Sequence, residues 1–194
     1  LVLLVDESQK ILASPLDAGL AAACKKPLNK DFKGKWKESL VLYVDSKISD
    51  RVLLLGIGKS SELTAHRFRT LGAQVVSSLK QLDLKGSVVL QMPTLRKPEV
   101  GLQAQALAEG MTLSQLGFTR FKSESETKKN HFYSFDLLTS TKDKKSVEAG
   151  IARGLTISQG VNWARSLIHT PGSHLSPNDL AEAAESVFKN AKNK

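Results

Sequence analysis

Cysteine is almost absent from this chain. Cys24 is the only cysteine among 194 residues, so the chain can form neither an internal disulfide nor a thiolate cluster for a metal. An oxidising compartment would offer such a chain no stabilising cross-link, and we expect a cytoplasmic protein. Because Cys24 lies in a stretch rich in Ala and Lys, it is interpreted as a core or helix residue rather than as a nucleophile.

Long apolar runs are also missing. Residues 1–5 are apolar, but Asp6 and Glu7 follow at once. Such a run is far shorter than the ~7 to 15 apolar residues of a signal peptide or the ~20 of a membrane span. The sequence therefore predicts a strand at residues 1–5 and no membrane partner.

Arginine and aromatic residues are scarce beside lysine. The chain has seven arginines and 21 lysines, a net charge of +9 and an aromatic content of 6%. A dedicated nucleic-acid binder usually adds arginine forks and exposed rings for base stacking. The lysine surplus therefore favours solvated surfaces, and a nucleic-acid partner is the less favoured alternative.

The sequence does contain short apolar runs that alternate with amphipathic segments. Five runs rich in Val and Leu are predicted strands, at residues 1–5, 40–44, 52–55, 88–92 and 132–138. Apolar residues recur at helical spacing in residues 61–82 and 98–116. Strands that alternate with helices indicate an α/β domain, and continuously apolar strands indicate a sheet covered on both faces.

One long helix is predicted over residues 142–168, after a polar segment at 119–130 that is expected to be an exposed loop. Such a helix would span roughly 40 Å and suits a spine between two domains. Gly150, Gly154 and Gly160 would each weaken it by about 1 kcal/mol unless close packing offsets that cost. Its repeating face is expected to contain Val147, Ile151, Leu155 and Ser158.

A linker follows this helix. Pro171 and Gly172 end the helical pattern, and Ser176, Pro177 and Asp179 announce another helix. The chain continues for only 17 residues after Pro177, so we expect the linker to lead to a further domain. The expected organisation is a domain at 1–141, the long helix at 142–170, and a linker with a first helix at 171–194.

One glycine-rich turn is a weak candidate for anion binding. It follows the predicted strand at 52–55, and its candidate residues are Gly56, Gly58, Lys59 and Ser60. Backbone amides at a helix N-terminus can hold a phosphate or carboxylate. A P-loop would need glycine where Leu53 stands, and a dinucleotide fingerprint would need glycine at Ser61. The favoured interpretation is a structural turn with Ser60 or Ser61 as the helix cap.

The remaining polar residues form no recognisable catalytic pattern. His169 and His174 flank Pro171 and Gly172, but no acidic or cysteine ligand stands beside them at a metal-binding spacing. Structural or solvent-exposed roles are favoured for all four histidines, and solvated charge for the carboxylates. The sequence thus predicts no self-sufficient active site. The other residues considered are His66, His131, Asp6, Glu7, Glu124, Glu126 and Asp179.

The segment 162–181 resembles the domain junction of the leucyl (cytosol) aminopeptidase family. These two-metal exopeptidases remove N-terminal residues from peptides, and their junction typically reads Ala-Arg-Asp-Leu-x-Asn-x-Pro-x-Asn-x-Leu-Thr-Pro. The residues that match are Ala164, Arg165, Leu167, Pro171, Leu175 and Pro177. The residues that depart from it are Ser166, His169, Ser173 and Ser176.

Three further segments agree with this resemblance, in order and in spacing. Residues 56–59 are similar to the family's Gly-Leu-Gly turn, and the long helix carries glycines ahead of Asn162. The stretch 108–123 is similar to the family's Glu-Gly…Leu…Tyr-x-Phe-x-x-Tyr-Lys pattern through Glu109, Gly110, Leu116, Phe118, Arg120, Phe121, Lys122 and Ser123. Together these segments cover residues 50–181.

The resemblance implies a macro-like, three-layer α/β domain with a mixed, mostly parallel sheet. A long helix would join it to a separate catalytic domain, which would hold two divalent ions, usually zinc with manganese or magnesium. No catalytic, metal or cofactor residue is assigned to this chain. Its implied partners are its own catalytic domain, the other subunits of a hexamer, and peptide substrates. The alternative is a macro-like module that binds ADP-ribose or nucleic acid.

Overall fold

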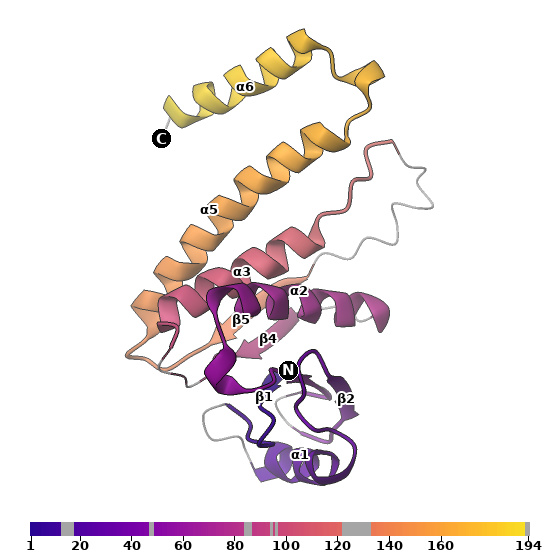
Figure 1. The fold of residues 1–194 in the computed structure, drawn as a ribbon, viewed down its shortest axis with the longest axis vertical. Coiled ribbons are helices and arrows are strands. Elements are labelled where there is room, and N and C mark those ends of the chain that lie inside the picture. The colour runs from indigo at the N-terminus through magenta and orange to yellow at the C-terminus, as the bar shows by residue number, and fades with distance from the viewer. Residues whose placement is uncertain are drawn as a thin grey trace.

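The computed structural model describes residues 1–12, 18–46, 49–83, 87–93, 95, 97–121 and 133–192. They form a five-stranded sheet with helices on both sides, followed by two long helices (Figure 1). The elements in chain order are β1 Val2–Val5, α1 Ala18–Lys30, β2 Ser39–Tyr43, β3 Arg51–Gly56, a 3-10 turn Ser60–Glu62, α2 Ala65–Gln81, β4 Ser87–Gln91, α3 Val100–Gln115, β5 Ser134–Leu138, α5 Lys144–His169, a 3-10 turn Gly172–His174 and α6 Pro177–Lys192.

The sheet has the strand order β2-β3-β1-β4-β5. β1 pairs in parallel with β3 and β4, β4 pairs in parallel with β5, and only the edge strand β2 is antiparallel. The central strand β1 is buried along its whole length, whereas β2 and β5 are partly exposed. The predicted mixed, mostly parallel α/β sheet is therefore confirmed.

Each face of the sheet has its own apolar core. Leu3 and Val5 of β1 pack with α1, while Val2 and Leu4 pack with α2 and α3 on the other face. Successive side chains of a strand point to opposite faces, so both sets must be apolar. This explains the uninterrupted apolar strands. Cys24 is 0% exposed in the α1 core, which confirms it as a core residue.

Helix α1 was not predicted from the sequence. Its apolar residues Leu20, Cys24 and Leu28 are spaced at helical intervals, but Pro27 lies inside the helix. A proline removes a backbone donor and normally ends a helix, which hides the pattern. Burial against the sheet face keeps this segment helical, because tertiary packing outweighs local propensity.

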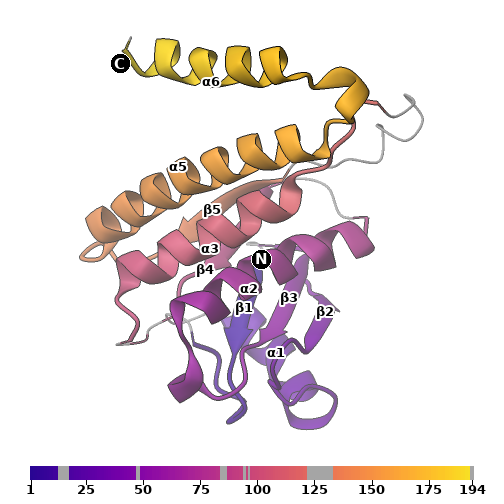
Figure 2. The same cartoon turned by 45° about the horizontal axis from the view of Figure 1, so that its top comes forward.

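The helices α2, α3 and α5 lie side by side over the other face of the sheet (Figure 2). Their contacts are lined by glycines: a Cβ atom on Gly110 of α3 would overlap the carbonyl oxygen of Arg69 on α2. Cβ atoms on Gly150 and Gly154 of α5 would likewise lie too close to the α3 carbonyl oxygens of Gly101 and Gln105. Glycine at such positions lets two helix backbones approach closely, so packing offsets the predicted weakening at Gly150 and Gly154 but not at Gly160, where a Cβ atom would have no neighbouring atom within 4 Å.

The buried face of α5 differs in part from the prediction. Val147 and Ser158 are buried as expected, but the face is completed by Gly150 and Gly154. Leu155, predicted on this face, is 39% exposed. Glycine carries no apolar side chain, so the periodicity of large residues could not identify the true contact line.

The start of α2 also differs from the prediction. α2 begins at Ala65, and Thr64 is its N-cap, with its side chain accepting from the Arg67 amide. Ser60 belongs to a separate 3-10 turn. The prediction that Ser60 or Ser61 caps the helix is therefore wrong, because the extended backbone at Leu63 separates the two elements. The predicted helices at 98–116 and 142–168 agree with α3 and α5 to within two residues.

Helix α6 lies apart from the sheet (Figure 1). In Figures 1 and 2 it turns back along α5 on the side opposite to α3. Its apolar side chains Leu180, Val187 and Phe188 are 48%, 43% and 70% exposed. Within the described part of the chain, no helix is both long and apolar enough to span a membrane. Most of the predicted loop at 119–130 lies outside the described residues.

Candidate interdomain junction

The end of α5 is tied to the end of α3 by two side chains. The Arg165 guanidinium donates to the carbonyl oxygen of Leu113 at 3.0 Å and to Asn162 Oδ1 at 3.4 Å. Asn162 in turn donates to the carbonyl oxygen of Thr112 at 3.4 Å. The last four carbonyl groups of a helix have no partner within it, and cationic side chains are favourable there. Arg165 and Asn162 therefore hold the C-terminal ends of α3 and α5 together.

The long helix ends at Thr170, where the backbone becomes extended. The Thr170 amide donates to the carbonyl oxygen of Leu167 at 3.1 Å. The Thr170 hydroxyl donates to the carbonyl oxygen of Ser166 at 2.8 Å. Pro171 follows and cannot continue the helix. A single 3-10 turn comes next, in which the His174 amide donates to the Pro171 carbonyl at 2.8 Å.

Helix α6 starts with a reciprocal cap formed by Ser176 and Asp179. The Asp179 carboxylate accepts from the Ser176 amide at 2.7 Å and from its hydroxyl at 2.6 Å. The Asp179 amide donates back to the Ser176 hydroxyl at 3.3 Å. The hydrogen bond from the Ser176 side chain is the largest cause of a lowered pKa at Asp179, and the bond from the Ser176 amide is the next. The positive charge of Arg120 lowers this pKa further. The predicted helix start at Ser176 is confirmed.

The two histidines of the junction contact aromatic rings. His169 lies against Phe118 with ring centroids 5.6 Å apart, and His174 lies against Phe121 at 4.6 Å. Both rings come from the segment that follows α3. The described residues contain no group of three His, Cys, Asp or Glu side chains placed to hold a metal, so His169 and His174 do not complete a metal site there.

The five junction residues singled out from the sequence are dispersed. Arg165 is held against α3, Leu167 and Leu175 are half-buried, and Pro171 and Pro177 are exposed. They mark where helices begin and end. The contacts that organise the junction involve Asn162, Phe118 and Phe121, whose pairing depends on residues about 50 positions apart.

The glycine-rich turn proposed as a weak anion site has three of its backbone amides occupied. Each backbone amide of Gly56, Ile57 and Gly58 already donates to a backbone carbonyl, at 2.7, 2.9 and 3.0 Å. Gly58 has φ +70°, and a Cβ atom on Gly56 would overlap the Lys35 carbonyl. Lys59 precedes the three-residue turn that begins at Ser60, and neither residue lies at the N-terminus of α2. Gly56 is needed because the neighbouring chain segment lies against it, and Gly58 because of its positive φ.

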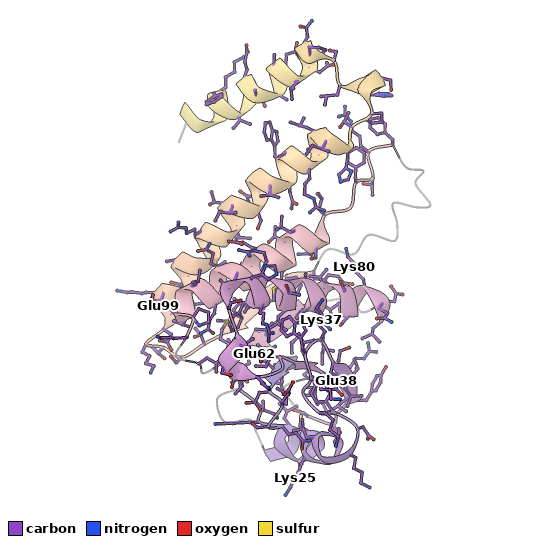
Figure 3. The ribbon with its side chains drawn as sticks, in the orientation of Figure 1. Lys25, Lys37, Glu38, Glu62, Lys80 and Glu99 are labelled. Atoms are coloured by element: carbon purple, nitrogen blue, oxygen red, sulfur yellow. The ribbon has the colours of Figure 1, made fainter. Side chains whose placement is uncertain are left out.

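The lysine surplus is spread over the surface. Figure 3 places Lys25 on α1, well away from Lys37 on the loop before β2 and from Lys80 at the end of α2. Lys80 donates to the Ser114 carbonyl at 2.8 Å, and Glu38 in the loop accepts from the amides of Lys33 and Lys35. These positions agree with solvated lysines on several faces.

A hollow of about 520 Å³ lies at the beginning of β1 and β3. Its charged lining residues are Asp50 and Arg51, and its aromatic residue is Tyr43. The Arg51 guanidinium lies over the Tyr43 ring, 5.3 Å from its centroid. The hollow brings together neither a nucleophile with a base nor a set of metal ligands, so its geometry supports no catalytic role.

The fold and the junction together define an α/β module whose long helix α5 is tied to the end of α3. Comparison with known proteins gives its family. The sequence profile of the cytosol aminopeptidase family, N-terminal domain, matches residues 2–125. The chain therefore belongs to the cytosol aminopeptidase family and contains its N-terminal domain, as the resemblance in the sequence indicated.

Relatives from several bacteria agree with this assignment. A probable cytosol aminopeptidase of Acidobacterium capsulatum is 28% identical over 88% of the chain and 34% of its own length. Those of Nostoc punctiforme and Rhodopseudomonas palustris are 31% and 30% identical, over 82% and 94% of the chain and 31% and 36% of their own lengths. The chain thus spans about a third of the length of these relatives.

Solved structures show the same fold. A tomato leucine aminopeptidase mutant is similar with a TM-score of 0.70 and 21% identity, over 97% of this chain and 39% of that chain. The bottromycin maturation enzyme BotP in complex with Mn is similar with a TM-score of 0.69 and 18% identity, over 92% and 34%. The comparisons support the aminopeptidase family over the alternative of a module that binds ADP-ribose or nucleic acid.

The family is metal-dependent, and the described residues do not fit its metals. Beyond the lack of a three-ligand cluster, the buried carboxylate Glu109 is already occupied. Arg69 Nε donates to it at 2.6 Å and Gln105 at 2.8 Å. A carboxylate held in this way on the α2–α3 contact is structural. We derive no chemical step through a metal at these residues.

Proposed function

We propose that this chain is the non-catalytic N-terminal domain of a leucyl aminopeptidase, which releases N-terminal amino acids from peptides in the cytoplasm. The observation that carries the proposal is the family match over residues 2–125, in a chain that spans about a third of its relatives. Catalysis and two divalent ions, zinc with manganese or magnesium, are assigned to a separate domain.

The proposed domain organisation places the body at 1–141, the spine at 142–170 and the linker with its first helix at 171–194. Support comes from the position of α6, which leaves the domain after the Pro171 turn (Figure 1). Its exposed apolar side chains, above all Phe188, suit a helix that packs in the core of the following domain.

The proposed role of the domain is to assemble a hexamer and to shape access to the active sites. The far half of α5 is consistent with such an interface, because Ile157, Val161 and Ile168 are 41%, 40% and 80% exposed. Apolar side chains that recur along one helix and remain open to water are typical of surfaces that another subunit or domain covers.

The experiment compares this chain with the same chain extended by a catalytic domain. Hydrolysis of a leucine chromogenic amide is measured with added zinc or manganese. We expect turnover from the extended protein and none from residues 1–194. Sedimentation velocity of both proteins reports assembly. Robust hydrolysis by residues 1–194 would overturn the assignment of this chain as non-catalytic.

A further inference from the structure

The short segment 117–121, which follows α3, touches the junction between α5 and α6 at three points. Phe118 contacts His169 at the end of α5, with centroids 5.6 Å apart. Phe121 contacts His174 in the 3-10 turn, at 4.6 Å. The two phenylalanine rings also contact each other, at 5.8 Å. Figures 1 and 2 both show this segment rising beside the turn that leads into α6.

The third point is electrostatic. The Arg120 guanidinium lies over the Phe121 ring, 5.4 Å from its centroid, and its charge contributes to the lowered pKa of Asp179. Asp179 belongs to the cap of α6. Ring contacts of this geometry and cation–π pairs are attractive even where they are partly exposed. The segment is therefore linked to the end of α5, the turn and the start of α6.

We propose that residues 117–121 form a strap that sets the direction in which α6 leaves the domain, with Phe118 and Phe121 as its positioning residues. His169 and His174 serve as the ring partners of the strap. The strap concerns residues 1–194 alone and does not depend on the proposed peptidase activity. The strap also gives a role to His169 and His174, because the described residues offer them no three-ligand metal site.

The physical basis is that the junction has few other restraints. Pro171, Gly172, Ser173 and Ser176 are exposed. Within the part of the chain that the structure describes, the backbone hydrogen bonds of the turn reach no further than neighbouring residues. Local turns fix the path of a few residues but not the angle of a following helix. Contacts with a segment anchored elsewhere in the fold can fix that angle, and Arg165 anchors the end of α3 beside the strap.

A distance measurement between spin labels tests the strap. Labels are attached to Ser77→Cys on α2 and Glu182→Cys on α6, both exposed positions. Cys24 is 0% exposed and remains unlabelled. We expect one narrow distance distribution for the otherwise unchanged chain and a broad one for Phe121→Ala. Phe188→Ala, which removes an exposed phenylalanine of α6 outside the strap, is expected to leave the distribution narrow.

Amide hydrogen exchange gives a second readout. The His174 amide donates to the Pro171 carbonyl at 2.8 Å and is expected to exchange about threefold to tenfold faster in Phe121→Ala, the range for the loss of one aromatic pair. Amides of β1 should be unchanged. His174→Ala removes the other ring of the pair at an exposed residue and should have the same effect as Phe121→Ala.

The outcomes are distinguishable. A broad distribution in Phe121→Ala and His174→Ala, with an unchanged unfolding midpoint, supports the strap. If Phe121→Ala also lowers the midpoint, His174→Ala decides alone. Two outcomes would overturn the proposal. The first is a distance distribution in His174→Ala that is as narrow as that of the unchanged chain. The second is a distribution in Phe188→Ala that is as broad as that in Phe121→Ala, because the direction of α6 would then not depend on the ring contacts.

Discussion

Gly150 on α5 faces the carbonyl oxygen of Gly101 on α3 at a distance that leaves no space for a methyl group. One turn further along, a Cβ atom on Gly154 would lie 2.6 Å from the Gln105 carbonyl oxygen and 3.1 Å from Ala108 Cβ. Gly160, in the same helix, has no neighbouring atom within 4 Å of such a Cβ. The three glycines that weaken the helix locally therefore have different roles.

This difference predicts opposite effects of the same substitution. Gly150→Ala is expected to lower the free energy of unfolding by about 1–3 kcal/mol, because overpacking forces the backbones of α3 and α5 apart. Gly160→Ala is expected to raise it by up to about 1 kcal/mol, because alanine favours the helix and nothing is displaced. Urea denaturation of both variants measures these changes, and equal effects would contradict the packing argument.

Glu109 is predicted to be the most sensitive carboxylate among those with a described ion pair. It is 3% exposed and accepts from Arg69 and Gln105. Glu109→Ala leaves these donors without their partner, and we expect a loss of about 2–4 kcal/mol, since the Arg69 side chain is 39% exposed and keeps part of its hydration. The control is Glu148→Ala. Glu148 forms an exposed ion pair with Lys144, with 3.8 Å between Oε1 and Nζ, and its substitution should change the free energy of unfolding by less than about 0.5 kcal/mol.

Arg165 is predicted to stabilise the last turns of both α3 and α5. Arg165→Met removes the donor to the Leu113 carbonyl, and we expect a loss of about 1–2 kcal/mol together with faster amide exchange near Thr170. Arg153→Met on the exposed part of the same helix is the matched control. If amide exchange near Thr170 becomes equally faster in both variants, the cause is the loss of one positive charge and not the loss of the hydrogen bond to Leu113.

Asp179 is predicted to make the start of α6 sensitive to acid. Its pKa is lowered in the folded chain, so its ionised form stabilises the cap at all pH values above its ordinary pKa of 3.8. That contribution is lost as the pH falls through the lowered value. An NMR titration should place the midpoint of Asp179 below 3.8, and Ser176→Ala should raise it.

Arg120→Ala should raise the Asp179 midpoint by less than Ser176→Ala does, because its charge is the weakest of the lowering causes. An Asp179 midpoint that Ser176→Ala leaves unchanged would contradict the assignment of the cap. A midpoint that responds only to Arg120→Ala would mean that charge, and not hydrogen bonding, dominates there.

The helices and strands were predicted correctly where a segment carries a single, unopposed sequence signal. Continuous apolar runs located β1, β3 and β4, and Pro171 with Ser176 located the end of α5 and the start of α6. In each case the evidence lies within a few residues. Prediction failed where local signals conflict. Pro27 conceals α1. The cap of α2 is Thr64 and not the predicted Ser60 or Ser61, because all three hydroxyl residues follow a strand and precede a helical pattern.

The candidate site shows the same limit. The glycine turn at residues 56–58 resembled an anion site because free amides are expected at a strand-to-helix turn. In the fold those amides donate to carbonyls of residues 38, 5 and 34, far away in the sequence. The contacts of Phe118 and Phe121 with the junction were missed for the same reason.

Local signals in the sequence are sufficient to predict the α/β class, the strands with apolar residues on both faces, and the point at which the long helix must end, because burial periodicity and proline geometry act locally. The folded chain was needed to learn that Gly150 serves packing while Gly160 does not, that the amides of residues 56–58 are occupied, and that His169 and His174 lie against rings. These outcomes depend on which distant backbone or side chain comes close, and that distance is set by the packing of whole elements.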